Sequence, residues 1–150
     1  MKILVTGATG FIGSKFVEEY SRDFSIQTAS VRDSNIDPAI FENVDAVVHL
    51  SGLAHQMKGA PDEAYFKANF ELTRDLARIA KAKGVKHFIY ISTAHVFGKQ
   101  GELGPSVAPL NEATPCHPSE AYGQSKLMAE QTVSKMASDD FLVSIIRPPL

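Results

Sequence analysis

The chain has 150 residues, a length at which a single domain buries roughly two-thirds of the surface that its unfolded chain exposes. Its 15 Lys and Arg nearly balance its 17 Asp and Glu, for a net charge of −2, and neither sign forms a block, which argues against binding to nucleic acid or to an anionic membrane. One cysteine, the loop thiol Cys116, and five scattered histidines argue against a disulfide framework and a metal site and fit a cytosolic location, as does the absence of a run of about 18 apolar residues or a signal sequence.

A short apolar run at residues 3–5, followed by three glycines at a spacing of three, opens the chain. The run is typical of a strand buried on both faces, and a helix is expected to begin at about Phe11. Gly7, Gly10 and Gly13 then lie where the strand turns into the helix, which is where a doubly wound sheet binds a dinucleotide. Glycine permits the tight turn and a close approach to the pyrophosphate, and the helix N-terminus offers free N–H groups to an anion. A purely structural turn remains the alternative.

The rest of the chain alternates between strand-like segments and segments with helical periodicity. Strands are expected at 25–31, 45–50, 85–92 and 141–147, and helices at 12–22, 62–83 and 121–138. Residues 33–43 are too few for a complete strand and crossover helix, so a shortened connection is expected there. Residues 97–120 form a long Gly/Pro-rich loop, of the kind that is usually functional or mobile. This order predicts an α/β fold: a doubly wound parallel sheet with helices on both faces and its chemistry at the carboxyl ends of the strands.

Three polar residues near those carboxyl ends form a candidate catalytic group. Thr93 follows the predicted strand at 85–92, and Tyr122 and Lys126 lie one turn apart on one face of the helix at 121–138. A free tyrosine has a pKa of about 10, and an ammonium about 4 Å away would stabilise the phenolate by roughly 4 kcal/mol. We therefore expect Lys126 to lower the pKa of Tyr122 so that it can act as a base, with the positive charge of an oxidised nicotinamide adding to this effect, while Thr93 holds the reacting oxygen. A Tyr and a Lys one turn apart also occur on many surface helices.

Six segments, taken in order, resemble motifs of the extended short-chain dehydrogenase/reductase family of NAD-dependent epimerases and dehydratases. They are TGATGFIG at 6–13, HLSG at 49–52, Asn69, STAHVFG at 92–98, YGQSK at 122–126 and Arg147-Pro148. The resemblance implies a Rossmann-type fold that binds NAD, with NADP as the alternative. It identifies Thr93 as the catalytic Ser/Thr, Tyr122 as the general acid/base and Lys126 as the lysine beside it. The cofactor-binding residues that it implies are Gly7, Gly10, Phe11, Ile12, Gly13, Arg32, Leu50, Ser51, Gly52, Tyr122 and Lys126.

The segment after the fourth predicted strand bears on the reaction. Family members that dehydrate nucleotide-hexoses carry T-D-E there, whereas this chain has Thr93-Ala94-His95 and lacks the acidic pair. The resemblance is therefore greatest to nucleotide-sugar 4-epimerases, which implies a UDP-hexose substrate, oxidation at C4 and return of the hydride. An NAD(P)-dependent reductase of a sugar or small carbonyl, and a non-catalytic dinucleotide-binding module, remain alternatives.

Several features are left open by the sequence. NAD-preferring members place an acid after the second strand, where this chain has Arg32 followed by Asp33, so Arg32 could contact a 2′-phosphate or simply pair with Asp33. His55, His95 and Asn69 could contact the ligands or be ordinary polar residues. Family members are about twice as long, so we expect residues 1–150 to be the dinucleotide-binding part of a longer, homodimeric enzyme, inactive without its substrate domain.

Overall fold

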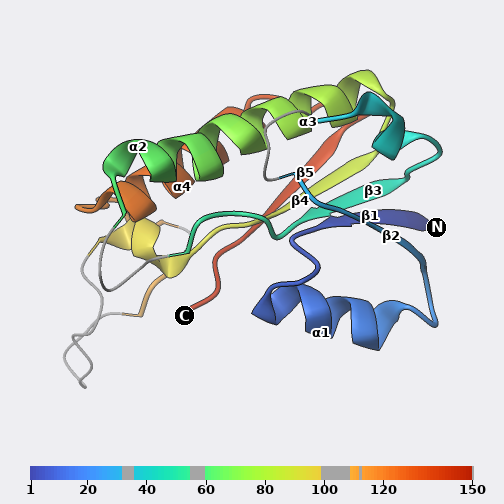
Figure 1. Ribbon diagram of the computed structural model, residues 1–150. Helices are drawn as coiled ribbons and strands as arrows, with labels where there is room; N and C mark the ends of the chain where they lie inside the picture. The colour runs from blue at the N-terminus through green and yellow to red at the C-terminus, as the bar shows by residue number, and fades with distance from the viewer. Residues whose placement is uncertain (32–35, 55–59, 99–108, 112, 150) are drawn as a thin grey trace.

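The computed structural model describes residues 1–31, 36–54, 60–98, 109–111 and 113–149. Their centre is one parallel sheet of five strands in the order β2-β1-β3-β4-β5 (Figure 1). The strands are β1 (Lys2–Thr6), β2 (Ser25–Ala29), β3 (Ala46–His49), β4 (His87–Ile91) and β5 (Leu142–Ile146). All five predicted strands are confirmed, although β2 ends two residues earlier than expected. β2 and β5 are the edge strands and are partly exposed along their length.

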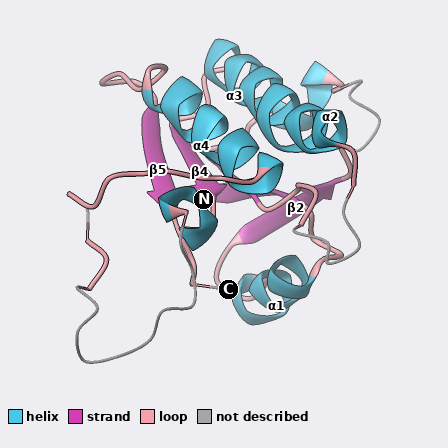
Figure 2. Cartoon of the chain, turned by 90° about the vertical axis from the view of Figure 1, so that its left-hand side faces the viewer, coloured by secondary structure: helices cyan, strands magenta, loops and turns pink. Residues whose placement is uncertain are grey.

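Helices cover both faces of the sheet, as predicted for a doubly wound fold. α1 (Phe11–Tyr20) lies on one face, and α2 (Asp62–Tyr65), α3 (Leu72–Ala82) and α4 (Ala121–Ser134) lie on the other (Figures 1 and 2). The larger apolar core, which includes Phe88 and Leu76, packs between the sheet and α3 and α4, and a smaller one lies under α1. Among the residues described, no helix has the length and apolar character needed to cross a membrane.

The segment predicted as one helix at 62–83 is helical throughout but changes its pitch. Between α2 and α3 lies a π-helical stretch, η2 (Phe66–Glu71), in which the N–H of Leu72 bonds to the carbonyl of Lys67, five residues back. The helix ends at Ala82, and Gly84 follows with φ +80°, the left-handed conformation that glycine adopts most readily after a helix. Isolated π-turns inside helices occur frequently at functional sites.

Two short 3₁₀-helices lie in the remaining connections that the structure describes. η1 (Pro38–Phe41) occupies the segment where a shortened connection was expected, and its Phe41 is buried in the larger core. η3 (Ala94–Phe97) directly follows β4, inside the segment that carries the predicted catalytic threonine. α4 ends at Ser134, four residues before its predicted end.

Candidate active site

The glycine turn after β1 is held by close backbone contacts that leave no room for side chains. Gly7 has φ +75°, and a Cβ there would lie 2.6 Å from the backbone nitrogen of Ser51. A Cβ at Gly13 would overlap the carbonyl oxygen of Gly7, so α1 packs directly on the turn. Gly10 is the N-cap of α1, which directs the unpaired N–H groups of the first helical turn toward the carboxyl edge of the sheet.

A crevice of about 880 Å³ opens beside this turn. Its lining residues are 7–10, 28–31, 50–53, and Ala64, Lys67, Ala68 and Leu72. It therefore lies where β1 is flanked by β2 and β3 and the connections leave to opposite faces, which is the switch point where doubly wound sheets bind ligands. Lys67 is the only charged side chain among the described lining residues, so the crevice suits an anionic ligand. Its size and the glycine clearances fit a dinucleotide.

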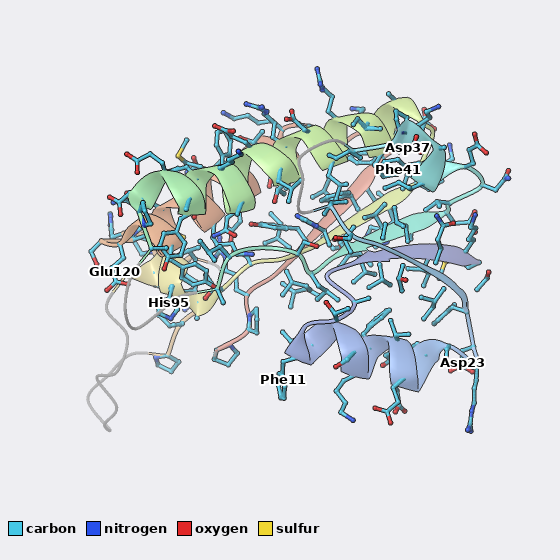
Figure 3. All side chains as sticks on the ribbon, in the orientation of Figure 1. Phe11, Asp23, Asp37, Phe41, His95 and Glu120 are labelled. Atoms are coloured by element: carbon cyan, nitrogen blue, oxygen red, sulfur yellow. The ribbon has the colours of Figure 1, made fainter. Side chains whose placement is uncertain are left out.

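Apart from Tyr122 and Lys126, which are described below, the cofactor residues predicted from the sequence fall into three groups. Gly7, Gly10, Leu50, Ser51 and Gly52 line the crevice, and Gly13 lies beneath the turn. The side chains of Phe11 and Ile12 are exposed, and Phe11 points away from the sheet (Figure 3), so only their backbone N–H groups can serve an anion. Arg32 and His55 lie outside the described residues.

Thr93 and Tyr122 meet at the carboxyl edge of the sheet. Thr93 is buried just after β4, and its side chain lies near enough to that of Tyr122, in the first turn of α4, to influence the pKa of the phenol. The N–H of His95 also donates to Thr93 Oγ1, at 3.2 Å. Close packing of α4 on η3 allows this meeting, since a Cβ at Gly123 would lie only 2.7 Å from the His95 carbonyl oxygen.

Aromatic rings surround the half-buried Tyr122. The ring of Tyr65 lies 6.0 Å from it and the ring of His95 lies 5.3 Å from it, both edge-on. His95 lies at the same end of the sheet as Glu120, the N-cap of α4 (Figure 3). His95 thus contacts the predicted catalytic tyrosine, which its position in the sequence had left open.

The pKa of Tyr122 differs from the sequence-based expectation. Burial raises the pKa of its phenol above the ordinary value, and the hydrogen bond with Thr93 offsets only part of this rise. The prediction that Lys126 lowers this pKa is therefore wrong for the chain by itself. Burial is the main cause of the shift, and the ammonium of Lys126 is directed to the carbonyl oxygen of Ile91 instead.

Lys126 is buried beneath the crevice edge. Its ammonium donates to the carbonyl oxygen of Ile91 at 2.9 Å and lies 4.8 Å from the centre of the Tyr90 ring. A Cβ at Gly52 would lie 3.5 Å from Lys126 Nζ, so the lysine borders the loop that lines the crevice. Burial lowers the pKa of Lys126 to about 8, and the carboxylate of Glu130, one turn further along α4, opposes this shift.

Asn69 lies in η2 and is fully buried. Its amide oxygen accepts from the N–H of Leu53 at 2.7 Å, and its amide nitrogen donates to the Leu53 carbonyl at 3.1 Å and to Ser125 Oγ at 3.2 Å. The amide therefore joins the crevice loop to α4, between Tyr122 and Lys126. Asn69 is thus fully occupied by hydrogen bonds to the crevice loop and to α4 and is not among the described residues that line the crevice.

Sequence reasoning missed two buried polar groups behind the site. One is the Glu130 carboxylate, which forms a bidentate ion pair with the Arg147 guanidinium; the shortest distance, from Arg147 Nη2 to Glu130 Oε2, is 2.6 Å. Its signal in the sequence was its place four residues after Lys126. The other is His49, a polar residue inside an otherwise apolar strand, which hydrogen-bonds to Thr6 and Thr73.

Comparison with known proteins places this site in a family. The model of the NAD dependent epimerase/dehydratase family matches residues 3–149. The chain is 31% identical to a UDP-glucose 4-epimerase of Vibrio cholerae over 99% of its own length and 51% of that protein. The chain thus spans about half the length of the curated relatives that it matches.

Solved structures share the fold. One is a short-chain dehydrogenase/reductase superfamily protein from Agrobacterium tumefaciens with bound NAD, 28% identical, with a TM-score of 0.78 over 98% of this chain and 48% of that one. Another is the UDP-Glc/GlcNAc 4-epimerase of Campylobacter jejuni, 25% identical, also with a TM-score of 0.78, over 97% of this chain and 52% of that one.

Proposed function

The chain belongs to the NAD dependent epimerase/dehydratase family, and from that premise we propose that it binds NAD and forms the cofactor half of a nucleotide-sugar 4-epimerase. The observation that carries the proposal is that Thr93 and Tyr122 lie together at the carboxyl edge of the sheet, near a glycine-lined crevice at its switch point. A purely binding module would have no need for this pair. The Vibrio cholerae relative supports a UDP-hexose as the substrate.

The residues of this chain would have separate roles in binding the cofactor and in transferring the proton. The free N–H groups after Gly10 bind the pyrophosphate, and the loop of Leu50, Ser51 and Gly52 forms the opposite wall of the crevice. When bound, NAD would supply the reversible hydride acceptor that inversion at C4 requires. Tyr122 Oη accepts the proton of the C4 hydroxyl and later gives it back. Thr93 Oγ1 orients the same oxygen.

Charge decides when Tyr122 can accept that proton. Because burial raises its pKa, the phenolate forms only when positive charge lies near the ring. Lys126, one turn further along α4, is the cation that this chain contributes, and its low exposure limits screening by water. We propose that Lys126 works together with the charge of the bound cofactor rather than alone.

The side chains next to Thr93 favour epimerisation over dehydration. Dehydratases of the family carry an acidic pair after the catalytic threonine, whereas this chain presents the buried methyl of Ala94 and the imidazole of His95. Removing water from a sugar requires groups that move protons at two further carbons. Epimerisation at C4 requires proton transfer only at the C4 oxygen.

Cofactor preference is testable at the β2 end of the crevice. Ser30 and Val31 line it, and no described lining residue is an acid that would repel a 2′-phosphate. We propose NAD as the cofactor and expect NADP to be tolerated. Calorimetric titration of the full-length protein with both dinucleotides measures this directly, and a hundredfold preference for NAD would show that the crevice rejects the 2′-phosphate.

The proposed reaction is tested by incubating the full-length protein with UDP-glucose and following inversion at C4 by proton NMR. Conversion to UDP-galactose without net consumption of dinucleotide is expected. Stoichiometric consumption of reduced cofactor would indicate a reductase, and binding of NAD without turnover would indicate a binding module.

Location and assembly complete the proposal. We place the enzyme in the cytosol, where its single cysteine, Cys116, stays reduced. We expect the full-length protein to be a homodimer. Light scattering that gave a monomeric mass at micromolar concentration would contradict this.

A further inference from the structure

A chain of buried hydrogen bonds runs behind the crevice. Thr6 at the end of β1, His49 at the end of β3 and Thr73 in α3 are all fully buried. Thr6 Oγ1 lies 2.7 Å from His49 Nδ1, and His49 Nε2 lies 2.9 Å from Thr73 Oγ1. The Thr73 hydroxyl donates to the backbone carbonyl of Asn69 at 2.6 Å. These four residues, which we call the hydrogen-bond relay, join two strands to the π-helical stretch η2.

The geometry fixes the direction of each bond. The Asn69 carbonyl only accepts, so the single hydrogen of the Thr73 hydroxyl is committed to it. Thr73 Oγ1 must then accept from His49, which places the imidazole proton on Nε2. His49 Nδ1 is left as the acceptor for the Thr6 hydroxyl. Every hydrogen bond of the relay is therefore donated in the same direction, from β1 toward η2.

His49 keeps this direction of hydrogen bonding over the physiological pH range because its imidazole stays neutral. Burial, and secondarily the charge of Lys126, lower the pKa of its imidazole to about 3. Its ring packs against Tyr90, with ring centres 5.7 Å apart, and against Phe88 at 5.9 Å. The neutral imidazole can thus donate to one threonine and accept from the other, which the charged form could not do.

The end of the relay is the turn that carries the Asn69 amide. That amide holds both backbone groups of Leu53, in the crevice wall, and donates to Ser125, on the helix of Tyr122 and Lys126. A threonine hydroxyl that bonds to the carbonyl four residues back competes with regular helical bonding and bends the helix. Thr73 does this within η2 and α3, where the pitch changes.

We propose that His49 and Thr73 are positioning residues, which hold the π-turn in register so that Asn69 clamps the crevice wall to the helix bearing Tyr122 and Lys126. Neither residue is among the described residues that line the crevice. The consequence for NAD rests on the proposed function, whereas the hydrogen-bond relay does not.

The relay is tested without any ligand by NMR of the 150-residue chain. The ¹⁵N shifts of His49 should report a neutral Nε2–H tautomer that does not titrate between about pH 5 and 8. Thr73→Val, which keeps the shape and removes the hydroxyl, should make the amide of Leu53 exchange with solvent about tenfold faster. Thr73→Ser should restore the slow exchange, and Thr132→Val, a matched change on α4, should leave it unaltered. An Nδ1–H tautomer, or unchanged exchange at Leu53 in Thr73→Val, would overturn the inference.

The consequence for the cofactor is tested by a double-mutant cycle in the full-length protein. Thr73→Val and Asn69→Ala should each weaken NAD binding about tenfold, and the double variant should bind no more weakly than Asn69→Ala alone. Additive losses would show that Thr73 does not act through Asn69. Failure of the unchanged protein to bind NAD would contradict the proposed function but not the relay. If Thr73→Val does not fold, the His49 tautomer of the unchanged chain still decides the matter.

Discussion

Tyr122 carries the residue-scale prediction with the largest expected effect. Tyr122→Phe removes only the ionisable hydroxyl, so the full-length enzyme should keep its affinity for NAD and lose at least about 100-fold in kcat. Thr93→Ala, which removes an orienting hydrogen bond, should cost less. Steady-state kinetics and NAD titration measure both effects, with Tyr20→Phe, an exposed tyrosine on α1, as the control. Turnover by Tyr122→Phe close to that of the unchanged enzyme would remove Tyr122 from the mechanism.

Lys126 should make stability depend on pH in a defined direction. Its pKa is about 8 in the folded chain and about 10.4 in an unfolded one, so between these values the unfolded chain holds more protons. The free energy of unfolding should therefore rise by up to about 3 kcal/mol as the pH increases through this window. The gain should be lost again as the pH falls back through 8.

Urea unfolding between about pH 7 and 11 measures this effect as the difference between the unchanged chain and Lys126→Met. Lys83→Met, at an exposed lysine that caps α3, is the matched control. An identical pH dependence in the unchanged chain and Lys126→Met would show that the lysine is not desolvated.

The sequence identified residues whose type and spacing carry the chemistry, but not their environment. Thr93, Tyr122 and Lys126 were found because their separations place them at one strand end and on one helix face. The direction of the Tyr122 pKa was wrong, because a helical spacing does not show that the ammonium bonds to the carbonyl of Ile91 or how deeply the ring is buried.

At the scale of elements, the pair of Glu130 and Arg147 fastens α4 to the end of β5. The Glu130 side chain is only 3% exposed, so Arg147→Met should leave a buried carboxylate unpaired and lower the free energy of unfolding by about 3–5 kcal/mol. Replacing both partners, as in Glu130→Leu with Arg147→Met, should restore much of this loss. Asp75→Asn, which breaks an exposed pair with Arg74, should cost less than about 1 kcal/mol. Similar losses for the buried and the exposed pair, in chemical denaturation, would contradict this account.

The elements themselves were largely predictable because their patterns are local. Strand-like segments, buried apolar runs in three of them, and a glycine turn located all five strands and α1, and Gly84 located the end of α3. The π-turn at Phe66–Glu71 was not predictable, since no glycine or proline interrupts the helical pattern there. It depends on partners distant in the sequence, above all His49 and Leu53.

At the scale of the whole molecule, we expect the 150-residue chain to fold, to bind dinucleotide weakly and to lack epimerase activity. It spans about half the length of its curated relatives, and Thr93 and Tyr122 lie at the edge of the sheet, where water would weaken every electrostatic interaction of the site. Leu142 and Ile146, on the edge strand β5, are 57% and 50% exposed, which favours self-association. Turnover of UDP-hexose by this chain on the order of 10 per second would show that it needs no further domain.

The fate of a label at C4 of the sugar tests the account most directly. The full-length protein is supplied with UDP-glucose that carries deuterium at C4, and the position of the deuterium in the product is read by NMR. Because the proposed reaction removes a hydride only from C4 and returns it without exchange of the dinucleotide, the deuterium should leave and return to the same carbon. The account predicts UDP-galactose that keeps its deuterium at C4. Transfer of the label to another carbon, its loss to free dinucleotide, or the absence of any C4 epimer would contradict it.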